Sequence, residues 1–284
     1  MSAGNREPVV WLNHEFVPLS QARISPLDRG FQYGDGLFET IRADKGRVLY
    51  LADHLKRLSA SAAELRIPFS KESDWRKIML SLLERNHLET GAARVKIMLT
   101  RGEAAGLGLP PASKPTILVT ADEYHPPAAR EYENGWSLHV FGQGYAPPLA
   151  QHKSLNYLYF MAARQAAMDA GCDEALIFGP DRIVAETAAG SLLVEMDGQW
   201  LIPQGAYFLP GTAQSRVKAI MSASGLVVEE RVITGDDLDR VRSVLVTNSL
   251  MGVMPVREID GSLLPRNASD LALRLRESFF AGSD

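Results

Sequence analysis

The sequence contains one cysteine, Cys172, so no intrachain disulfide can form and nothing calls for an oxidising compartment. No apolar stretch approaches the roughly 18 residues that a membrane-spanning helix needs, because the most apolar segment, 243–256, is interrupted by Thr-Asn-Ser at 247–249. The only apolar run near the start of the chain, VVWL, is too short for the core of a signal peptide. We therefore expect a soluble cytoplasmic protein.

Several functional classes lose their main support because their motifs are missing. The sequence has 30 basic and 34 acidic residues, a formal net charge of -4 and no run of Lys or Arg, so we expect no nucleic-acid partner. The six histidines are scattered without an HExxH motif, and a single cysteine cannot form a CxxC motif, so we expect no metal centre. There is also no GxSxG, Walker or GxGxxG sequence, which argues against a serine hydrolase, a P-loop NTPase and a Rossmann dehydrogenase.

The composition and length fit an ordinary globular protein of about two domains. Hydrophobic residues make up 46% and charged residues 23% of the 284 positions. The segment 121–131 combines two prolines with charged residues and has no apolar periodicity, so we predict a linker there. It would join a small α+β domain, residues 1–120, to a larger domain, residues 132–284.

Hydrophobic periodicity predicts the elements of both domains. For the first domain it predicts a hairpin that turns at Asn13-His14, strands at 36–43, 47–51, 95–100 and 116–120, and helices at 51–65 and 70–87. For the second it predicts helices at 155–170, 212–224 and 270–280 among many hairpins, two of which turn at Asp197-Gly198 and Asp260-Gly261. Many hairpins with few helices indicate a barrel-like core of mostly antiparallel strands.

Two residues of the second domain have the chemistry that a phosphorylated aldehyde cofactor requires. Lys153 lies between a proline-rich segment and an apolar helix, where partial burial would favour a neutral amine that can form a Schiff base. Glu186 follows a predicted strand and could keep a pyridine nitrogen protonated. Taken singly, each has a simpler interpretation. Lys153 could be a surface lysine at a helix start, and Glu186 could be a solvated glutamate at a turn.

Further segments could bind a phosphate group. In LPGTAQSRV, residues 209–217, a Pro-Gly pair opens a helix, so the amides of Gly211, Thr212 and Ala213 would form an anion site, or simply an ordinary helix start. The strand-end sequence VTNSL, 246–250, offers small polar side chains that fit a phosphate site or an ordinary turn. Arg57 lies four residues after Asp53 on a helix, which also fits a surface ion pair.

Taken together and in order, these segments resemble the fold-type IV enzymes that use pyridoxal 5'-phosphate (PLP), the class IV aminotransferase family. The resemblance covers nearly the whole chain and rests on DRGFQYGDGLFETIR (28–42), DHLKRLSASAAELRI (53–67), HKSLNYL (152–158), IVAET (183–187), LPGT (209–212) and VTNSLMGVMPV (246–256). It implies an α+β fold with a small N-terminal domain and a larger C-terminal pseudo-barrel that binds PLP, and a homodimer with a neighbour's loop at each active-site mouth.

The resemblance also implies roles for individual residues. Lys153 would be the Schiff-base lysine and proton shuttle, Glu186 the partner of the pyridinium nitrogen, and Arg57 a phosphate ligand. The phosphate cup would be completed by Gly211, Thr212, Ala213, Asn248 and Ser249. Many members read G-I-T-R where this chain has Gly-Thr-Ala-Gln at 211–214, so Ala213 would contribute only its amide. Tyr157 would approach the phenolic oxygen of the cofactor, although a core tyrosine on an apolar helix is an equally good interpretation.

The substrate depends on fewer residues. The loop 100–110 lacks the Arg-x-His carboxylate trap of the D-amino acid aminotransferases, and Phe38-Glu39-Thr40 differs from the Phe-Glu-Gly of branched-chain aminotransferases. Thr40 resembles the aminodeoxychorismate lyases of folate biosynthesis. We therefore expect a lyase that releases pyruvate from 4-amino-4-deoxychorismate and leaves 4-aminobenzoate, with Thr40 helping to deliver a proton. The alternative is an aminotransferase for a branched-chain or D-amino acid. Arg42, Arg101 or an arginine of the second subunit would bind the second carboxylate of the lyase substrate.

Overall fold

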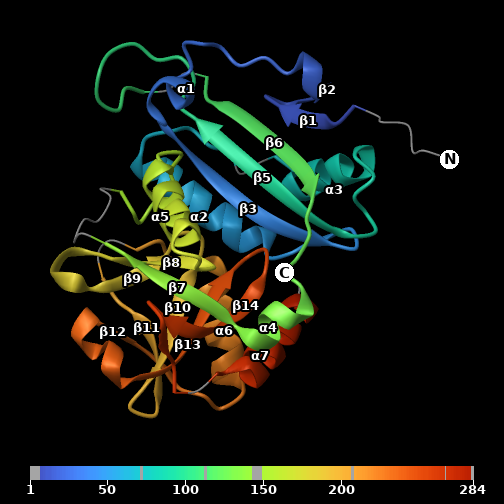
Figure 1. Cartoon of the computed structure of the whole chain (residues 1–284). Helices are drawn as coiled ribbons and strands as arrows, with labels where there is room; N and C mark the ends of the chain where they lie inside the picture. Colours follow the sequence, from blue (N-terminus) through green and yellow to red (C-terminus); the bar gives the residue numbers. More distant parts are fainter. Residues whose placement is uncertain are drawn as a thin grey trace. The chain divides into compact units, whose positions relative to one another are not determined.

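The computed structural model describes residues 7–70, 73–111, 114–142, 149–205, 208–265 and 267–282. Contacts divide the chain into two compact units, the first made of Met1–Pro126 with Lys153–Asn156 and the second of Pro127–His152 with Tyr157–Gly282 (Figure 1). Between them, strand β6 (Thr116–Glu123) ends and helix α4 (Ala129–Asn134) begins. The segment without regular structure is therefore shorter than the predicted 121–131, because residues 121–123 still pair with strand β5 (Ala92–Thr100).

The first unit is built on a six-stranded sheet of order β2-β1-β6-β5-β3-β4, in which all neighbours are antiparallel. Its strands are β1 (Val9–Leu12), β2 (Glu15–Pro18), β3 (Gly36–Asp44), β4 (Arg47–Val48), β5 (Ala92–Thr100) and β6 (Thr116–Glu123). Its helices are α1 (Arg29–Tyr33), α2 (Leu51–Glu64) and α3 (Trp75–Arg85), with a short 3-10 helix at Leu19–Gln21. The predicted strands and both predicted helices are present.

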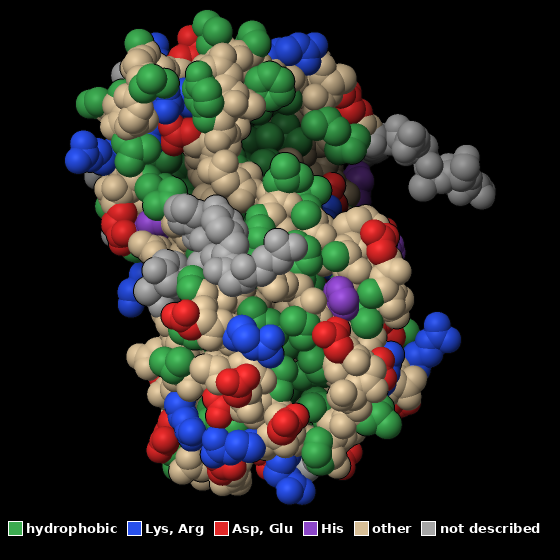
Figure 2. Space-filling view, turned by 60° about the vertical axis from the view of Figure 1, so that its left-hand side comes forward, with side chains coloured by type: hydrophobic (Ala, Val, Ile, Leu, Met, Phe, Trp, Pro, Cys, Tyr) green, Lys and Arg blue, Asp and Glu red, His purple; other side chains and the backbone are tan. Residues whose placement is uncertain are grey.

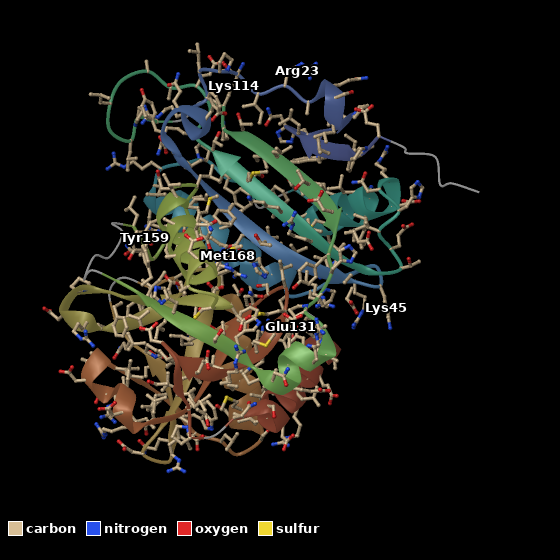
Figure 3. All side chains as sticks on the ribbon, in the orientation of Figure 1. Arg23, Lys45, Lys114, Glu131, Tyr159 and Met168 are labelled. Carbon is tan, nitrogen blue, oxygen red and sulfur yellow. The ribbon has the colours of Figure 1, made fainter. Side chains whose placement is uncertain are left out.

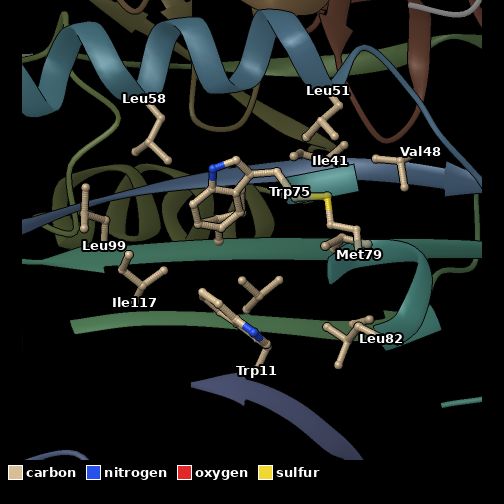
Figure 4. Close-up of a cluster of buried hydrophobic side chains, with 14 of the residues drawn as sticks. Trp11, Ile41, Val48, Leu51, Leu58, Trp75, Met79, Leu82, Leu99 and Ile117 are labelled. Carbon is tan, nitrogen blue, oxygen red and sulfur yellow. The ribbon is translucent and has the colours of Figure 1, made fainter. Parts of the chain in front are cut away.

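The core of this unit lies between one face of the sheet and helices α2 and α3 (Figures 1 and 4). Alternate residues of β3 and β5 point into it, as the period of two in a strand requires. The rings of Trp11 on β1 and Trp75 on α3 meet edge to face, with centroids 5.7 Å apart. Leu51 and Leu58 of α2 belong to the same core as Ile41 of β3, so the core holds α2 against β3. This contact sets the position of the polar side chains that α2 directs at the strand.

Positive φ angles occur at the predicted hairpin turns. Asn13 and His14 have φ angles of 47° and 81°, and Lys45, labelled in Figure 3, precedes Gly46 at the β3–β4 turn with φ angles of 48° and 72°. The short helix α1 is not predicted by periodicity. It begins because the Asp28 carboxylate accepts a hydrogen bond from the Gly30 amide at 2.7 Å and others from Thr100 and Thr116.

The second unit is built on a nine-stranded sheet in which β12-β11-β10-β13-β14-β7-β8-β9 form a continuous path and β15 pairs with β14. Its strands are β7 (Trp136–Phe141), β8 (Glu174–Phe178), β9 (Val184–Thr187), β10 (Ser191–Met196), β11 (Gln199–Pro203), β12 (Val228–Arg231), β13 (Val241–Asn248), β14 (Gly252–Ile259) and β15 (Ser262–Leu263). Its helices are α4 (Ala129–Asn134), α5 (Leu158–Asp169), α6 (Thr212–Ala223) and α7 (Ser269–Ala281), with 3-10 turns at Pro180–Arg182 and Gly235–Arg240.

Most neighbours in this sheet are antiparallel, as predicted, but three pairs are parallel. The pairs β7–β8, β7–β14 and β11–β12 run in the same direction. A parallel pair needs a crossover connection, and α5 joins β7 to β8 while α6 joins β11 to β12. The two ends of the path meet, since the Val184 amide near the start of β9 donates to the Ile233 carbonyl just after β12 at 2.7 Å. The sheet therefore curls into a partly closed barrel around an apolar core.

Two helices of this unit differ from the prediction. Helix α5 begins at Leu158 rather than at residue 155, because residues 153–155 form a strand-like bridge with β3. Helix α4 is too short to show periodicity, and the Glu131 side chain, labelled in Figure 3, accepts the backbone amide of Ala128 at 2.8 Å.

The described residues form no helix that is both long and apolar enough to span a membrane. On the face in Figure 2, Lys and Arg side chains are interspersed with Asp and Glu. No extended surface of one charge is visible there, in keeping with the nearly balanced composition.

Candidate active site

Lys153 belongs to the first unit and is held by its backbone. Its carbonyl accepts a hydrogen bond from the Phe38 amide at 2.8 Å, and the Leu155 amide donates to the Gly36 carbonyl at 2.9 Å. The lysine is half-buried, and its Nζ lies over the Phe38 ring, 4.7 Å from the centroid. The simple interpretation as a lysine at a helix start is therefore wrong, because this residue lies beside the edge of β3.

A second lysine, which the sequence analysis did not single out, shares this aromatic ring. Lys96 on β5 places its Nζ 4.8 Å from the centroid of Phe38. Burial, with a smaller contribution from the charge of Arg94, lowers the pKa of Lys96 below its ordinary value. Thr40 pairs directly with Lys96 across β3 and β5, so their side chains lie on the same face of the sheet. That face of the first unit thus gathers two amines, a hydroxyl and an aromatic ring.

Arg57 points from α2 at the middle of β3. Its Nε and Nη2 donate to the Glu39 carboxylate at 2.8 and 2.7 Å, and the His54 Nδ1 lies 2.6 Å from the same carboxylate. The side chain of Arg57 is 11% exposed and that of Glu39 is 1% exposed. The interpretation of Arg57 as a surface residue is therefore wrong, although a phosphate contact at Arg57 stays a prediction.

In the second unit, Glu186 and Tyr157 lie near each other. Glu186 is a buried residue within β9, not a solvated glutamate at a turn. Burial, and then the charge of Glu186, raise the pKa of Tyr157 well above its ordinary value. The Tyr157 hydroxyl donates to the Ala188 carbonyl at 2.6 Å, and its ring stacks on Phe160 with centroids 4.9 Å apart. Tyr157 is therefore a protonated side chain with a fixed orientation.

The turn between β9 and β10, residues 188–190, is held from several sides. Besides the contact with Tyr157, the Asn248 Nδ2 donates to the Ala189 carbonyl at 3.2 Å. The Asn248 Oδ1 accepts the amides of Leu250 and Met251 at 3.0 and 2.8 Å. These contacts of Asn248 stabilise turns. Its role as a phosphate ligand stays a prediction, because the side chain would have to contact the phosphate in addition to these backbone groups.

The start of helix α6 has the donor chemistry that a phosphate group requires. Gly211 is the N-cap and α6 begins at Thr212, so the helix start is confirmed as local structure. A Cβ at Gly211 would lie 2.4 Å from the Ser191 hydroxyl, so only glycine fits without a shift. The Thr212 hydroxyl lies 3.3 Å from the Ser249 hydroxyl. A helix N-terminus beside two hydroxyls is a favourable anion site, so these residues fit the phosphate of PLP.

The arginines suggested for a substrate carboxylate are engaged within the first unit. Arg101 is fully buried, and its five N–H groups donate to Asp35 and to the carbonyls of Leu65, Arg66 and Pro110. Arg42 donates to Asp44 at 3.1 Å. Of the three alternatives for the substrate carboxylate, Arg101 has no N–H group left to donate.

A third arginine of this unit shapes the loop after β5. Arg29 pairs with Asp35 at 2.7 Å, and its two Nη atoms donate to the carbonyls of Gly106 and Gly108 at 2.8 and 2.9 Å. These contacts tie the loop to helix α1. Between the two glycines, Leu107 is the side chain that the loop presents to its surroundings, and it is 92% exposed.

The candidate residues thus form two groups, one in each unit. The first contains Thr40, Arg57 and Lys153, and the second contains Tyr157, Glu186, Gly211, Thr212, Ala213, Asn248 and Ser249. Across the described ranges, His, Cys, Asp and Glu side chains form no cluster suited to a metal ion. Glu39, His54 and Lys96 were not predicted. Glu39 and Lys96 are polar residues within strands, and His54 lies on helix α2, so these positions become informative only when the strand register and the buried face of the helix are known.

Comparisons with known proteins show which family the chain resembles. The model of the family described as amino-transferase class IV matches residues 36–259. A protein of Methanocaldococcus jannaschii, provisionally named a branched-chain-amino-acid aminotransferase, is 31% identical over 95% of this chain and 94% of its own length. The D-alanine aminotransferase of Bacillus licheniformis is 28% identical over 91% of each chain.

Solved structures show the same likeness. The T.th. branched-chain amino acid aminotransferase, in complex with N-(5'-phosphopyridoxyl)-L-glutamate, superposes with a TM-score of 0.86. It is 28% identical, and the match covers 97% of this chain and 93% of that chain. Each of the proteins described here carries the name of an aminotransferase. Because the family model and these relatives cover most of the sequence, the chain belongs to the class IV aminotransferase family.

Proposed function

We propose that this PLP-dependent enzyme is an aminotransferase for an apolar amino acid of the branched-chain type. The relatives support amino transfer over the lyase reaction. The observation that carries the proposal is Arg101, whose N–H groups are all committed to Asp35 and to backbone carbonyls. A substrate with a second carboxylate needs cationic partners, and this arginine does not supply one.

The residues present fit PLP. When bound, PLP supplies a ring that takes up negative charge from the substrate carbon next to the nitrogen. Lys153 would tether the cofactor and move the proton at that carbon, and Glu186 would accept a hydrogen bond from the ring nitrogen. Tyr157 would sit beside the phenolic oxygen. Arg57 and the start of α6, from Gly211 to Ala213, would hold the phosphate together with Asn248 and Ser249.

Chain continuity supports a common role for Lys153 and the second group of residues. Lys153 and Tyr157 are four residues apart, so their Cα atoms lie within ~15 Å of each other. The Tyr157 hydroxyl is bound to Ala188, two residues after Glu186. The contact with the Phe38 ring restricts the conformations of the Lys153 side chain. The amine therefore loses little conformational freedom when it binds the cofactor.

Lys96 is our candidate for the substrate α-carboxylate. It places an ammonium group on the ring that Lys153 also contacts, and its partial burial strengthens an ion pair with a carboxylate. The family resemblance implies a neighbour's loop at each active-site mouth, and the loop at 106–108 would offer Leu107 there rather than a charged side chain, because its carbonyls face Arg29. An apolar side chain is therefore the better match for the remainder of the substrate.

The lyase reaction on 4-amino-4-deoxychorismate is the second candidate. It is favoured by Thr40, whose hydroxyl stands opposite Lys96 and could deliver a proton to the leaving side. Under this alternative, Lys96 and an arginine of a second subunit would share the two carboxylates.

An amino-transfer assay separates these functions. The holoenzyme is mixed with L-leucine, L-isoleucine, L-valine or D-alanine, and transfer to 2-oxoglutarate is followed by chromatography of the products. We expect transfer from the L-branched-chain amino acids. Transfer from D-alanine alone would favour the D-amino acid activity, and pyruvate release from 4-amino-4-deoxychorismate without any transfer would refute the proposal. Lys153→Arg, which keeps the charge, should abolish every activity and prevent borohydride from fixing the cofactor to the protein.

A homodimer is part of the proposal. Leu27, Phe31 and Leu107 of the first unit are 60%, 79% and 92% exposed. Arg29 ties helix α1 to the loop that carries Leu107, so these side chains belong to one region. An exposed apolar region of this kind is typical of a protein interface. Sedimentation should give twice the mass of the chain, and a monomer at micromolar concentration would contradict this part.

A further inference from the structure

We propose that Glu39 is a positioning residue that presents Arg57 to the cofactor phosphate. This inference rests on the proposed function, because it takes Arg57 as a phosphate ligand. It assigns Glu39 and its partner His54 a task in cofactor binding that goes beyond the stability of the core.

Glu39 lies at a place where a carboxylate is costly. The inward face of β3 carries Leu37, Ile41 and Ala43, which belong to the apolar core under α2, and Glu39 stands between them with 1% of its side chain exposed. A charged group at such a position is stable only when it is paired and hydrogen-bonded. An apolar residue would complete the core as well, so the carboxylate calls for an explanation.

The partners of Glu39 come from one face of α2. Arg57 donates through Nε to one oxygen and through Nη2 to the other, while His54 contacts the second oxygen. Burial acts to raise the pKa of Glu39, but the charge and hydrogen bonds of Arg57 and His54 lower it to about 2. The carboxylate therefore stays ionised at neutral pH, and the two parallel hydrogen bonds fix the plane of the guanidinium group.

Two effects of Glu39 on a bound phosphate have opposite signs. Its negative charge weakens the attraction between Arg57 and a dianion, whereas the fixed plane removes the search among the conformers of a long, flexible side chain. We infer that orientation dominates, because the contact with Glu39 holds the Nε–Nη2 edge of the guanidinium and so determines where its opposite edge lies. Residues that orient the ligands of a metal ion typically contribute ~10–100-fold to its affinity, and we expect an effect of the same order here.

A pair of cofactor forms isolates the phosphate contact. PLP and pyridoxal share the same ring and aldehyde, but pyridoxal has no phosphate. Both are titrated into the apoprotein, and binding is followed by absorbance. The dissociation constant of pyridoxal divided by that of PLP then reports the phosphate site alone, and a loss of general stability does not move this ratio.

Three variants apply this measurement. Glu39→Asp keeps the charge but is one methylene too short for both hydrogen bonds with Arg57, and Glu39→Gln removes the charge. We expect each to weaken PLP binding by ~10–100-fold while pyridoxal binding changes by less than about 3-fold. Asp44→Asn is the matched control, because it disturbs the Arg42–Asp44 pair of the same strand, and its ratio should equal that of the wild type.

Arg57→Gln separates the phosphate contact of Arg57 from the positioning role of Glu39. If this variant leaves the ratio unchanged, Arg57 does not bind the phosphate and that part of the proposed function fails. If Arg57→Gln lowers the ratio but both Glu39 variants leave it unchanged, the positioning role is overturned. Tighter PLP binding in Glu39→Gln would also overturn it, because charge would then dominate over orientation. Circular dichroism of each variant shows whether it folds, and the Asp variant serves if the Gln variant does not.

Discussion

Replacing Arg101 with Met tests whether this arginine is structural. The guanidinium group is fully buried and holds three parts of the first unit together, namely Asp35, the end of α2 and the loop that reaches Pro110. Methionine matches the arginine side chain as far as Nε and has no donor. We expect a large loss of stability, and substrate recognition should be retained in the protein that still folds.

The size of the loss follows from the partners that remain. Removing one side of a buried ion pair costs about 3–5 kcal/mol. Asp35 keeps its contact with Arg29 at 2.7 Å, which favours the lower end of that range. Three carbonyls each lose a hydrogen bond from a charged donor, which adds to the cost where water does not replace the donor. We therefore expect the free energy of unfolding to fall by about 4 kcal/mol and Tm to fall by about 10 °C.

Thermal and urea unfolding of the holoenzyme provide the measurement, with Arg94→Met as the matched control. Arg94 on β5 pairs with Asp122 on the surface, where both side chains are about half exposed, so its loss should cost less than about 1 kcal/mol. A Tm for Arg101→Met close to that of the wild type, together with a large increase in KM for an amino donor, would show that Arg101 binds substrate and that the structural argument is wrong.

Other predictions follow from the same contacts. The pKa of Glu39 lies at about 2, below its ordinary value of 4.5. Its ionised form therefore contributes about 3 kcal/mol to the free energy of unfolding above pH 4.5, and this contribution is lost as the pH falls towards 2. Urea unfolding of Glu39→Gln should lack that part of the pH dependence. In Gly211→Ala, the new Cβ would meet the Ser191 hydroxyl at 2.4 Å, so we expect weaker PLP binding, and adding Ser191→Gly should restore part of it. Lys96→Met should raise KM for the amino donor about tenfold or more while the cofactor stays bound, and an unchanged KM would remove Lys96 from the substrate site.

Local sequence signals predicted the elements that depend on local chemistry. The apolar spacing of α2 and the turns at Asp197-Gly198 and Asp260-Gly261 were found because helical period and turn residues are properties of neighbouring positions. Helix α1 was missed because its cap depends on Asp28 binding Thr100 and Thr116, which are distant in the sequence. The parallel pairs were missed because periodicity does not report which strands are neighbours.

The candidate site shows the same division. The helix start at Gly211 was predicted from a local Pro-Gly sequence, and the structure has α6 beginning at the next residue. The burial of Glu186 and the bridge that holds Lys153 to β3 were not predicted, since each depends on how strands align. The resemblance to the family supplied what spacing did not, while its finer suggestion of a lyase received less support from the relatives than the aminotransferase alternative.

Arg57 and Arg101 show why sequence alone could not assign the arginines. Both are buried or nearly so, and both make a two-pronged contact with a carboxylate of the first unit. They differ in what surrounds that contact, because Arg101 directs its remaining N–H groups at three backbone carbonyls, whereas the carboxylate that Arg57 meets is shared with a histidine on the same helix. Carbonyls from two separate segments, the end of α2 and the loop at Pro110, tie Arg101 to the fold, while Glu39 and His54 fix the plane of Arg57 from one side. The unfolding experiment on Arg101 and the cofactor-binding experiment on Arg57 measure these two outcomes independently.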